Sequence, residues 1–291
     1  MFAILGAAGK IGYQTSKALR ERGMPVRAIL RDAAKADRLS TIGCDVAFAD
    51  IQDAATLAKA IAGAKTVQVI LPPQPQAEDM GADLRRSIES VATALEETRP
   101  TVVLAISDYG AHLGRGFGIP SLFFELEERL RRLAGRKIFV RSAEHMENWG
   151  RVAPVAAATG VLPSLIAPVN RLFPTVSAQE VGLVAADLLL RPDIGAAEQI
   201  VHVEGPRRYS AADVAAAIGN VLGRPVIAEA TPRAQWEESL GRIMKPGTVG
   251  LMTELYDVHN RGLIDVEPNV GEIRYGTTEP IDALRSLVST R

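Results

Sequence analysis

The sequence predicts an α/β fold in which helices cover both faces of a parallel sheet. Two observations lead to this prediction. The apolar run at residues 1–5 breaks at Gly6, Gly9 and Gly12 and continues at once into a helical pattern over residues 13–22. Further along the chain, short apolar runs alternate with amphipathic stretches at spacings that suit crossover connections between parallel strands.

Each expected element has a local cause in the sequence. The strands are apolar runs, as expected where both faces of a sheet are covered. Asp53 caps one helix and Gly63 ends it, a capping box from Ser177 to Glu180 begins another, and Ser210 caps a third. The expected strands are residues 1–5, 25–30, 44–48, 65–71, 101–106, 137–141 and 199–203, and the expected helices are 13–22, 53–63, 78–98, 120–133, 177–190, 210–222, 233–243, 251–261 and 281–288. Residues 154–168, rich in alanine, proline and leucine, are expected to be a mobile or substrate-covering segment.

Composition narrows the class of protein. The 291 residues carry a formal net charge of −1, so no basic surface indicates nucleic acid binding. No apolar run is long enough to span a membrane and no signal peptide precedes the first strand, which predicts a cytoplasmic protein. The single cysteine, Cys44, excludes an internal disulfide and is expected to be a buried packing residue and not a reactive thiol. His112, His202 and His259 lack ligand spacing, so no metal site is expected.

The glycine-rich turn predicts a dinucleotide site. A pyrophosphate must lie against bare backbone at the positive end of a helix, where the first N–H groups have no internal partners. Gly6 would make the turn out of the strand, Gly9 would leave room for the phosphates, and Gly12 would let the helix pack closely on the sheet. The spacing is GxxGxxG, which is typical of short-chain and extended dehydrogenase/reductases.

Residues after the second strand bear on the choice of cofactor. Arg31 follows that strand directly, and Lys35 adds a second cation, a pair that suits the 2′-phosphate of NADP. The alternative is that both cations simply lie on a solvated surface turn. The neighbouring Asp32 is an acidic residue, and in NAD-specific folds an acidic residue at this position accepts bonds from the ribose hydroxyls. Asp50, which follows the third strand, either holds the adenine amino group or merely ends the strand.

Taken together, several segments resemble the NmrA-like group of atypical short-chain dehydrogenase/reductases. They are Gly6-Ala-Ala-Gly-Lys-Ile-Gly12, Val26-Arg-Ala-Ile-Leu-Arg-Asp32, Leu71-Pro-Pro73, Ala105-Ile-Ser107, Phe139-Val-Arg-Ser-Ala-Glu-His-Met-Glu-Asn-Trp149, residues 174–182 and residues 209–225. The resemblance implies a Rossmann-type doubly wound sheet with a smaller C-terminal α/β cap region. It places the NAD(P)-binding domain at residues 1–150, with 175–204 added to its core, and the substrate or cap region mainly at 151–291.

The resemblance also implies the site residues. Cofactor-binding positions are expected at Gly6, Ala8, Gly9, Lys10, Ile11, Gly12, Arg31, Lys35, Asp50, Ile51, Leu71, Pro72 and Ser107, and the substrate pocket at Pro73, Phe124, Asn148 and Trp149. An indole in a hinge is also a common core residue, so Trp149 has a packing interpretation beside the functional one.

The usual proton-transfer residues of short-chain reductases are missing. Those enzymes use Tyr-x-x-x-Lys, in which the lysine lowers the pKa of the tyrosine, whereas Leu113 stands four residues after Tyr109. Several members of the family instead keep a lysine three residues before a glutamate; Glu127 matches that glutamate, which puts Phe124 at the lysine position, or Glu125 if the register slips by one. Tyr109 and His145 are left as the candidate proton donors.

Two functions remain open at this stage. The first is an NADPH-dependent oxidoreductase that transfers hydride to a small planar acceptor such as a quinone, with NADP(H) favoured over NAD(H). The second is a non-catalytic sensor that binds NADP(H) and acts through a regulatory protein partner. The expected partners are therefore a dinucleotide and a small-molecule acceptor, with no nucleic acid or membrane, and either a homo-oligomer or a regulatory protein is possible.

Overall fold

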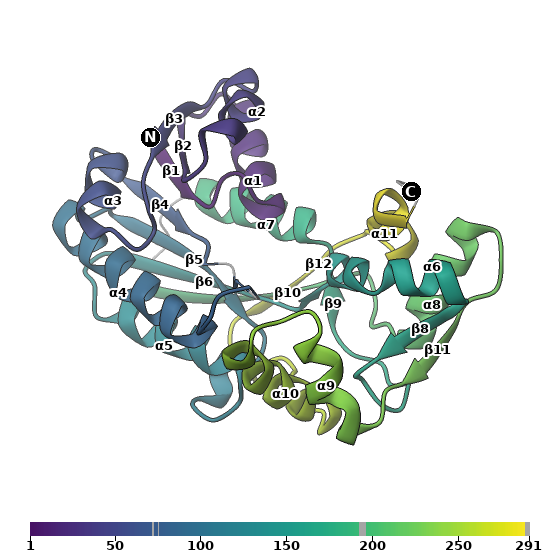
Figure 1. Cartoon of the computed structure of the whole chain (residues 1–291). Coiled ribbons are helices and arrows are strands. Elements are labelled where there is room, and N and C mark those ends of the chain that lie inside the picture. Colours follow the sequence, from purple (N-terminus) through teal and green to yellow (C-terminus); the bar gives the residue numbers. More distant parts are fainter. Residues whose placement is uncertain (72, 75, 192–195, 289–291) are drawn as a thin grey trace.

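The computed structural model describes residues 1–71, 73–74, 76–191 and 196–288 (Figure 1). Its strands are β1 Phe2–Leu5, β2 Val26–Leu30, β3 Asp45–Phe48, β4 Thr66–Val69, β5 Val102–Asp108, β6 Arg136–Ser142, β7 Glu144–His145, β8 Val161–Ser164, β9 Thr175–Val176, β10 Glu198–Glu204, β11 Ile227–Ala230 and β12 Glu272–Tyr275. Its α-helices are α1 Lys10–Glu21, α2 Ala36–Thr41, α3 Ala54–Ile61, α4 Met80–Thr98, α5 Ile119–Arg131, α6 Ala153–Thr159, α7 Ala178–Leu190, α8 Ala211–Leu222, α9 Trp236–Gly241, α10 Pro246–Asn260 and α11 Pro280–Val288. Short 3₁₀ helices include η1 Ala33–Lys35 and η3 Met146–Arg151.

A parallel sheet of eight strands organises the larger lobe, in the order β12-β10-β6-β5-β4-β1-β2-β3. Each neighbouring pair in this sheet is parallel, from β2 with β3 at one edge to β10 with β12 at the other. The strand order reverses between β1 and β4, and in such sheets ligands bind at this switch point, outside the carboxyl ends of the strands. The predicted α/β Rossmann-type fold class is confirmed.

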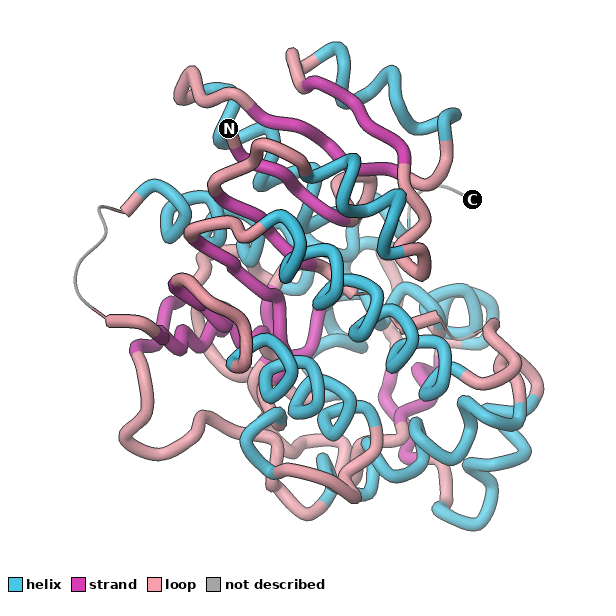
Figure 2. The backbone as a smooth tube through the Cα atoms, turned by 90° about the vertical axis from the view of Figure 1, so that its left-hand side faces the viewer, coloured by secondary structure: helices cyan, strands magenta, loops and turns pink. Residues whose placement is uncertain are grey.

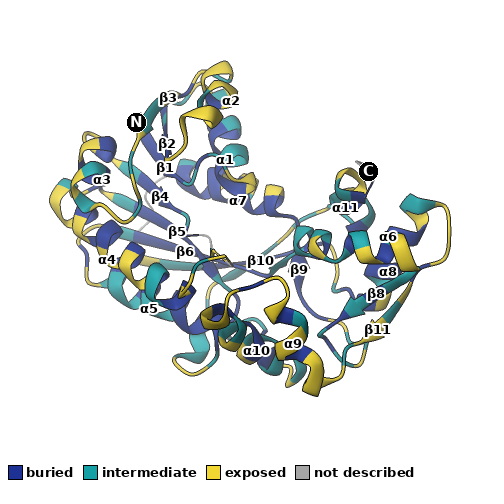
Figure 3. Ribbon diagram, viewed as in Figure 1, coloured by how far each residue is buried: buried dark blue, intermediate teal, exposed yellow. Residues whose placement is uncertain are grey.

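The sheet has a separate apolar core on each face, because successive residues of a strand point to opposite sides. On β1, Ala3 and Leu5 join the core under α3, α4 and α5, whereas Phe2 and Ile4 join the core under α1 and α7. In Figure 2 the helices of the first of these faces lie in front of the strands, and Figure 3 shows the central strands buried.

A third apolar core lies in a smaller lobe at the other side of the molecule, which holds α11, whereas β1 lies in the larger lobe (Figure 1). This core contains Trp149 together with residues of α6, β8, α8 and α11. The lobe has its own two-stranded parallel sheet, in which Val161 of β8 pairs with Ile227 of β11.

The structure departs from the expectation for residues 154–168. This stretch contains most of α6 and all of β8, and Ala156, Leu162 and Ile166 are buried in the third core. Its small and apolar residues therefore serve packing within the smaller lobe, which corrects the expectation of a mobile segment. Strands β11 and β12 and helix α2 were also not expected from the sequence.

Within the parts of the chain that the structure describes, none of the helices combines the length and apolar character needed to cross a bilayer.

Candidate functional site

A cavity of about 740 Å³ opens at the carboxyl ends of the sheet strands, between the two lobes. Its walls come from the loops after β1, β2, β4 and β5, from the segment after β6, and from one side of α10. Clefts of this size at the switch point of an α/β sheet are the usual place for a bound cofactor or substrate.

The glycine turn at one end of the cavity needs glycine for reasons of space. Gly6 has φ of +70°, a conformation that side chains disfavour. A Cβ at Gly12 would lie 2.5 Å from the carbonyl oxygen of Gly6 and 2.7 Å from Cα of Ala7. Gly12 therefore allows the first turn of α1 to pack on the loop itself.

The same turn presents free backbone donors. Gly9 is the N-cap of α1 with no side-chain capping bond, and no acidic residue lies in the first turn. The N–H of Tyr13 bonds to the carbonyl of Gly9, so those of Lys10, Ile11 and Gly12 come before the first intrahelical bond. All three residues line the cavity, which makes this helix end suited to a phosphate group.

Cations lie on the cavity wall beside this turn. Arg31 and Lys35 are exposed, line the cavity, and form no ion pair with any residue that the structure describes. The carboxylate of Asp32 between them accepts the N–H of Ala34 at 3.0 Å and so caps η1. An anion such as a phosphate monoester would therefore meet two unpaired positive charges here.

The structure brings most of the residues expected at the cofactor and substrate sites to this one cavity. The lining includes Gly6, Ala8, Gly9, Lys10, Ile11, Gly12, Arg31, Lys35, Ile51, Leu71, Pro73, Ser107, Tyr109, His145 and Asn148. Pro72 lies outside the described residues.

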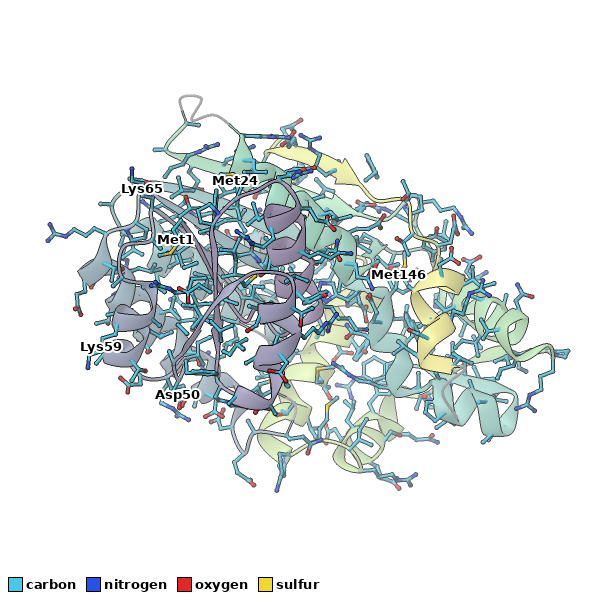
Figure 4. The ribbon with its side chains drawn as sticks, turned by 90° about the horizontal axis from the view of Figure 1, so that it is seen from above. Met1, Met24, Asp50, Lys59, Lys65 and Met146 are labelled. Atoms are coloured by element: carbon cyan, nitrogen blue, oxygen red, sulfur yellow. The ribbon has the colours of Figure 1, made fainter. Side chains whose placement is uncertain are left out.

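Three expected residues do not line the cavity. Asp50 is exposed, lies at the periphery of the larger lobe in Figure 4, and accepts the N–H of Gln52 at 2.9 Å, which fits a strand end. Trp149 packs in the core of the smaller lobe, against Phe173 at 6.5 Å between ring centroids. Phe124 lies on α5 with Arg115 over its ring, and it is the preceding Phe123 that faces the cavity.

Tyr109 is committed to a buried polar cluster. Its hydroxyl donates to Oε1 of Glu204 at 2.6 Å, and Glu204 is also paired with Arg208. Burial, followed by the bond to Glu204, raises the pKa of Tyr109 far above its usual range. The pKa of Tyr109 is thus shifted in the opposite direction to that of the catalytic tyrosine in ordinary short-chain reductases, which a lysine lowers.

Glu127, the residue matched to the family glutamate, anchors the cavity floor. Its carboxylate accepts bonds from Ser107 at 2.6 Å and from Arg141 at 2.8 and 2.9 Å, and Arg131 approaches it at 3.0 Å. Glu127 and Arg141 are buried. The network fixes Ser107 at the end of β5.

His145 is also held in place. Its Nε2 lies 2.8 Å from Oγ of Ser142, and that hydroxyl donates to the carbonyl of Ala143. This contact holds the imidazole against the end of β6. Burial lowers the pKa of His145, with Lys10 and Arg151 acting in the same direction and Glu147 against it, so the ring is neutral near pH 7.

The cavity wall also holds side chains that were not among the residues expected from the sequence, and these include Asp108, Glu144, Tyr256 and His259. Burial raises the pKa of Asp108 to about 6 and that of Glu144 to about 7. Tyr256 and His259 lie on α10, more than a hundred residues after Glu144 in the sequence, so the spacing of residues could not indicate that they share a site. Asp108 could have been found, since it follows Ser107 at the same strand end. Among the described residues, no group of three or more His, Cys, Asp or Glu is placed to hold a metal.

The fold and the site together define a Rossmann-type dinucleotide-binding protein. Residues 6–132 match the family model described as NAD(P)H-binding, so the chain has an NAD(P)H-binding domain. The resemblance to atypical short-chain dehydrogenase/reductases is confirmed at the level of this domain and of the fold.

Individual proteins are similar over nearly the whole chain. An NAD(P)H azoreductase from Xenophilus azovorans is 28% identical over 276 residues, which cover 93% of this chain and 92% of the azoreductase. An NADPH-dependent quinone oxidoreductase from Escherichia coli has a TM-score of 0.77 at 20% identity, and a triphenylmethane reductase from Citrobacter sp. has 0.80 at 16%. Each of these two alignments covers 99% of both chains.

Proposed function

We propose that this protein is an NADPH-dependent oxidoreductase that reduces a small planar acceptor such as a quinone or an azo compound. The observation that carries the proposal is that one cavity joins a phosphate-binding helix end to an apolar slot. When bound, NADPH would supply the hydride, and the chain's residues would position the cofactor and acceptor.

The cofactor end of the cavity supports a pyrophosphate and a 2′-phosphate. The free N–H groups of Lys10, Ile11 and Gly12 suit the pyrophosphate. Arg31 and Lys35 suit the 2′-phosphate, because charge-assisted bonds to phosphate are stronger than bonds to a neutral ribose hydroxyl. On this basis we propose NADPH as the preferred cofactor. NADPH and NADP(H) are the cofactors in the solved complexes of the quinone and triphenylmethane reductases.

The other end of the cavity supports a flat apolar acceptor. Phe123, Met252, Leu255 and Tyr256 line it, and the first three offer only apolar surface. Methionine and aromatic side chains adapt to planar ring systems. We further propose that the sheet lobe, residues 1–150 with 175–204, binds the dinucleotide, and that the smaller lobe closes the acceptor end.

Stopped-flow oxidation of bound NADPH tests the proposal. Protein loaded with NADPH is mixed with quinones, azo dyes and cationic triarylmethane dyes, and cofactor absorbance is followed. We expect at least one class to oxidise the cofactor faster than it does in buffer. Tight NADPH binding without oxidation by any acceptor would contradict the enzyme and favour the redox sensor.

A further inference from the structure

Glu144 lies on the cavity wall in a fixed position. It belongs to β7, which pairs in parallel with β9 in the register Glu144 to Thr175. This short ladder holds the backbone immediately after the sheet strand β6. The side chain lines the cavity and is 15% exposed.

One oxygen of the Glu144 carboxyl has no hydrogen-bond partner among the residues that the structure describes. Oε2 is buried and forms no hydrogen bond, and Nε2 of His259 lies 3.6 Å away, too far for one. Burial lowers the pKa of His259 to about 4, so the ring is neutral near pH 7 and the two groups form no ion pair. A carboxylate would be poorly solvated here, whereas a carboxylic acid fits the site.

The surrounding groups favour the acid on balance. Burial is the largest influence on the pKa of Glu144, and the negative charge of Asp108 on β5 raises it further. Arg151 and a hydrogen bond from Asn148, both on η3, act in the opposite direction. From α10, Tyr256 contributes no charge, since burial raises its pKa.

We propose that Glu144 is the proton donor for reductions in this cavity, an inference that rests on the proposed function. A two-electron reduction of a quinone or azo group needs a hydride and a proton. Bound NADPH supplies the hydride and leaves as NADP⁺. The O–H bond of Glu144 breaks, an O–H or N–H bond forms on the acceptor, and the carboxylate regains a proton from water.

The other candidate donors on the wall are less suited. The hydroxyl of Tyr109 is held by Glu204, and Nε2 of His145 is already hydrogen-bonded to Ser142. Oδ1 of Asp108 accepts the N–H of Gly110 at 2.8 Å, a bond that favours the carboxylate. Oε2 of Glu144 accepts no hydrogen bond from the described residues, and the bond from Asn148 to this carboxyl does not offset the effect of its burial.

Two acceptor classes separate proton transfer from hydride transfer. A quinone needs both, whereas a triarylmethane cation becomes its neutral leuco form by gaining a hydride alone. We expect Glu144→Gln to slow single-turnover quinone reduction by about a hundredfold and to leave reduction of the dye cation at the wild-type rate. Wild-type quinone reduction should fall above about pH 7, with this dependence absent in the variant. Glu229→Gln, an exposed change on β11, is the matched control.

A readout without cofactor checks the protonation state. Infrared spectra of the unliganded protein near pH 6 should show a protonated-carboxyl band to which Asp108 also contributes; Glu144→Gln should remove the larger part of this band, and Glu229→Gln should leave it unchanged. Equal rates of quinone reduction in wild type and Glu144→Gln would overturn the inference about Glu144 and leave the proposed function standing. The same holds if Asp108→Asn, and not Glu144→Gln, abolishes the pH dependence. A wild-type protein that reduces neither the quinone nor the dye cation would overturn the proposed function itself.

Discussion

The hydroxyl of Tyr109 donates a hydrogen bond to Oε1 of Glu204 at 2.6 Å, from the end of β5 to the end of β10. This bond joins two strands on either side of β6 in the sheet. It makes Tyr109 part of the buried framework that supports the cavity, although the residue is the tyrosine nearest to the position used for catalysis in ordinary short-chain reductases.

We therefore predict that Tyr109→Phe affects stability and not proton transfer. Removing the hydroxyl leaves Glu204 with Arg208 as its remaining partner, which should lower the free energy of unfolding by about 1–3 kcal/mol. The pH profile of NADPH oxidation should keep its wild-type shape. Denaturant titration and stopped-flow profiles measure the two effects, and a profile flattened by the variant would show that Tyr109 donates the proton.

A second prediction concerns the glycine turn. Gly12→Ala places a Cβ 2.5 Å from a backbone oxygen that cannot move without opening the loop. We expect a loss of about 1–3 kcal/mol in stability, together with weaker NADPH binding.

Gly250→Ala is the matched control for that variant. Gly250 lies within α10, and a Cβ there meets nothing within 4 Å. Alanine should stabilise this helix by about 0.5–1 kcal/mol. Thermal unfolding of both variants measures the difference. Equal changes in stability would contradict the close packing at Gly12 as the cause of the loss in Gly12→Ala.

The buried network under Ser107 gives a third prediction. Glu127→Gln leaves Arg141 and Arg131 facing a neutral amide, and breaking a buried pair costs about 3–5 kcal/mol. Glu128→Gln, the next residue on α5, removes only a surface pair with Arg131 and should cost less than about 1 kcal/mol. Chemical denaturation of both variants measures the difference, and similar values would argue against a structural role for Glu127.

The fourth prediction uses pH. The pKa of Glu144 is raised from 4.5 to about 7 by folding, so the folded state binds this proton more tightly than the unfolded state. Its contribution to stability is complete below about pH 4.5 and is lost as pH rises through about 7, on the order of 3 kcal/mol. Relative to wild type, Glu144→Gln should therefore gain in melting temperature between about pH 5 and pH 8. A constant difference across this range would contradict the raised pKa.

Local patterns in the sequence predicted the larger lobe well. The glycine turn and the apolar runs depend on neighbouring residues, so they predicted every strand of the large sheet except the edge strand β12, and with them the loops that follow those strands. The smaller lobe depends on contacts between distant segments, such as β8 with β11, and residues 154–168 therefore gave a misleading composition signal.

The same distinction applies to the site. Gly6, Gly9 and Gly12 could be found from spacing, and Arg31 from its place after a strand. Glu144 and His259 become functional candidates only when α10 folds over the end of β6 and burial changes their protonation. Phe124 was expected in the pocket, but the neighbouring Phe123 lies on the side of α5 that faces the cavity.

The central claim is that the first turn of α1 and the cations after β2 bind NADPH. Fluorescence titration of NADPH and NADH tests it on wild type, on Arg31→Ala and on Lys59→Ala, a control in an exposed position on α3 outside the cavity. We predict that Arg31→Ala weakens NADPH binding by about 10- to 100-fold, as expected for loss of a charge-assisted bond, while NADH binding and the control stay at wild-type values. Equally weak binding of both nucleotides by all three proteins would contradict the account.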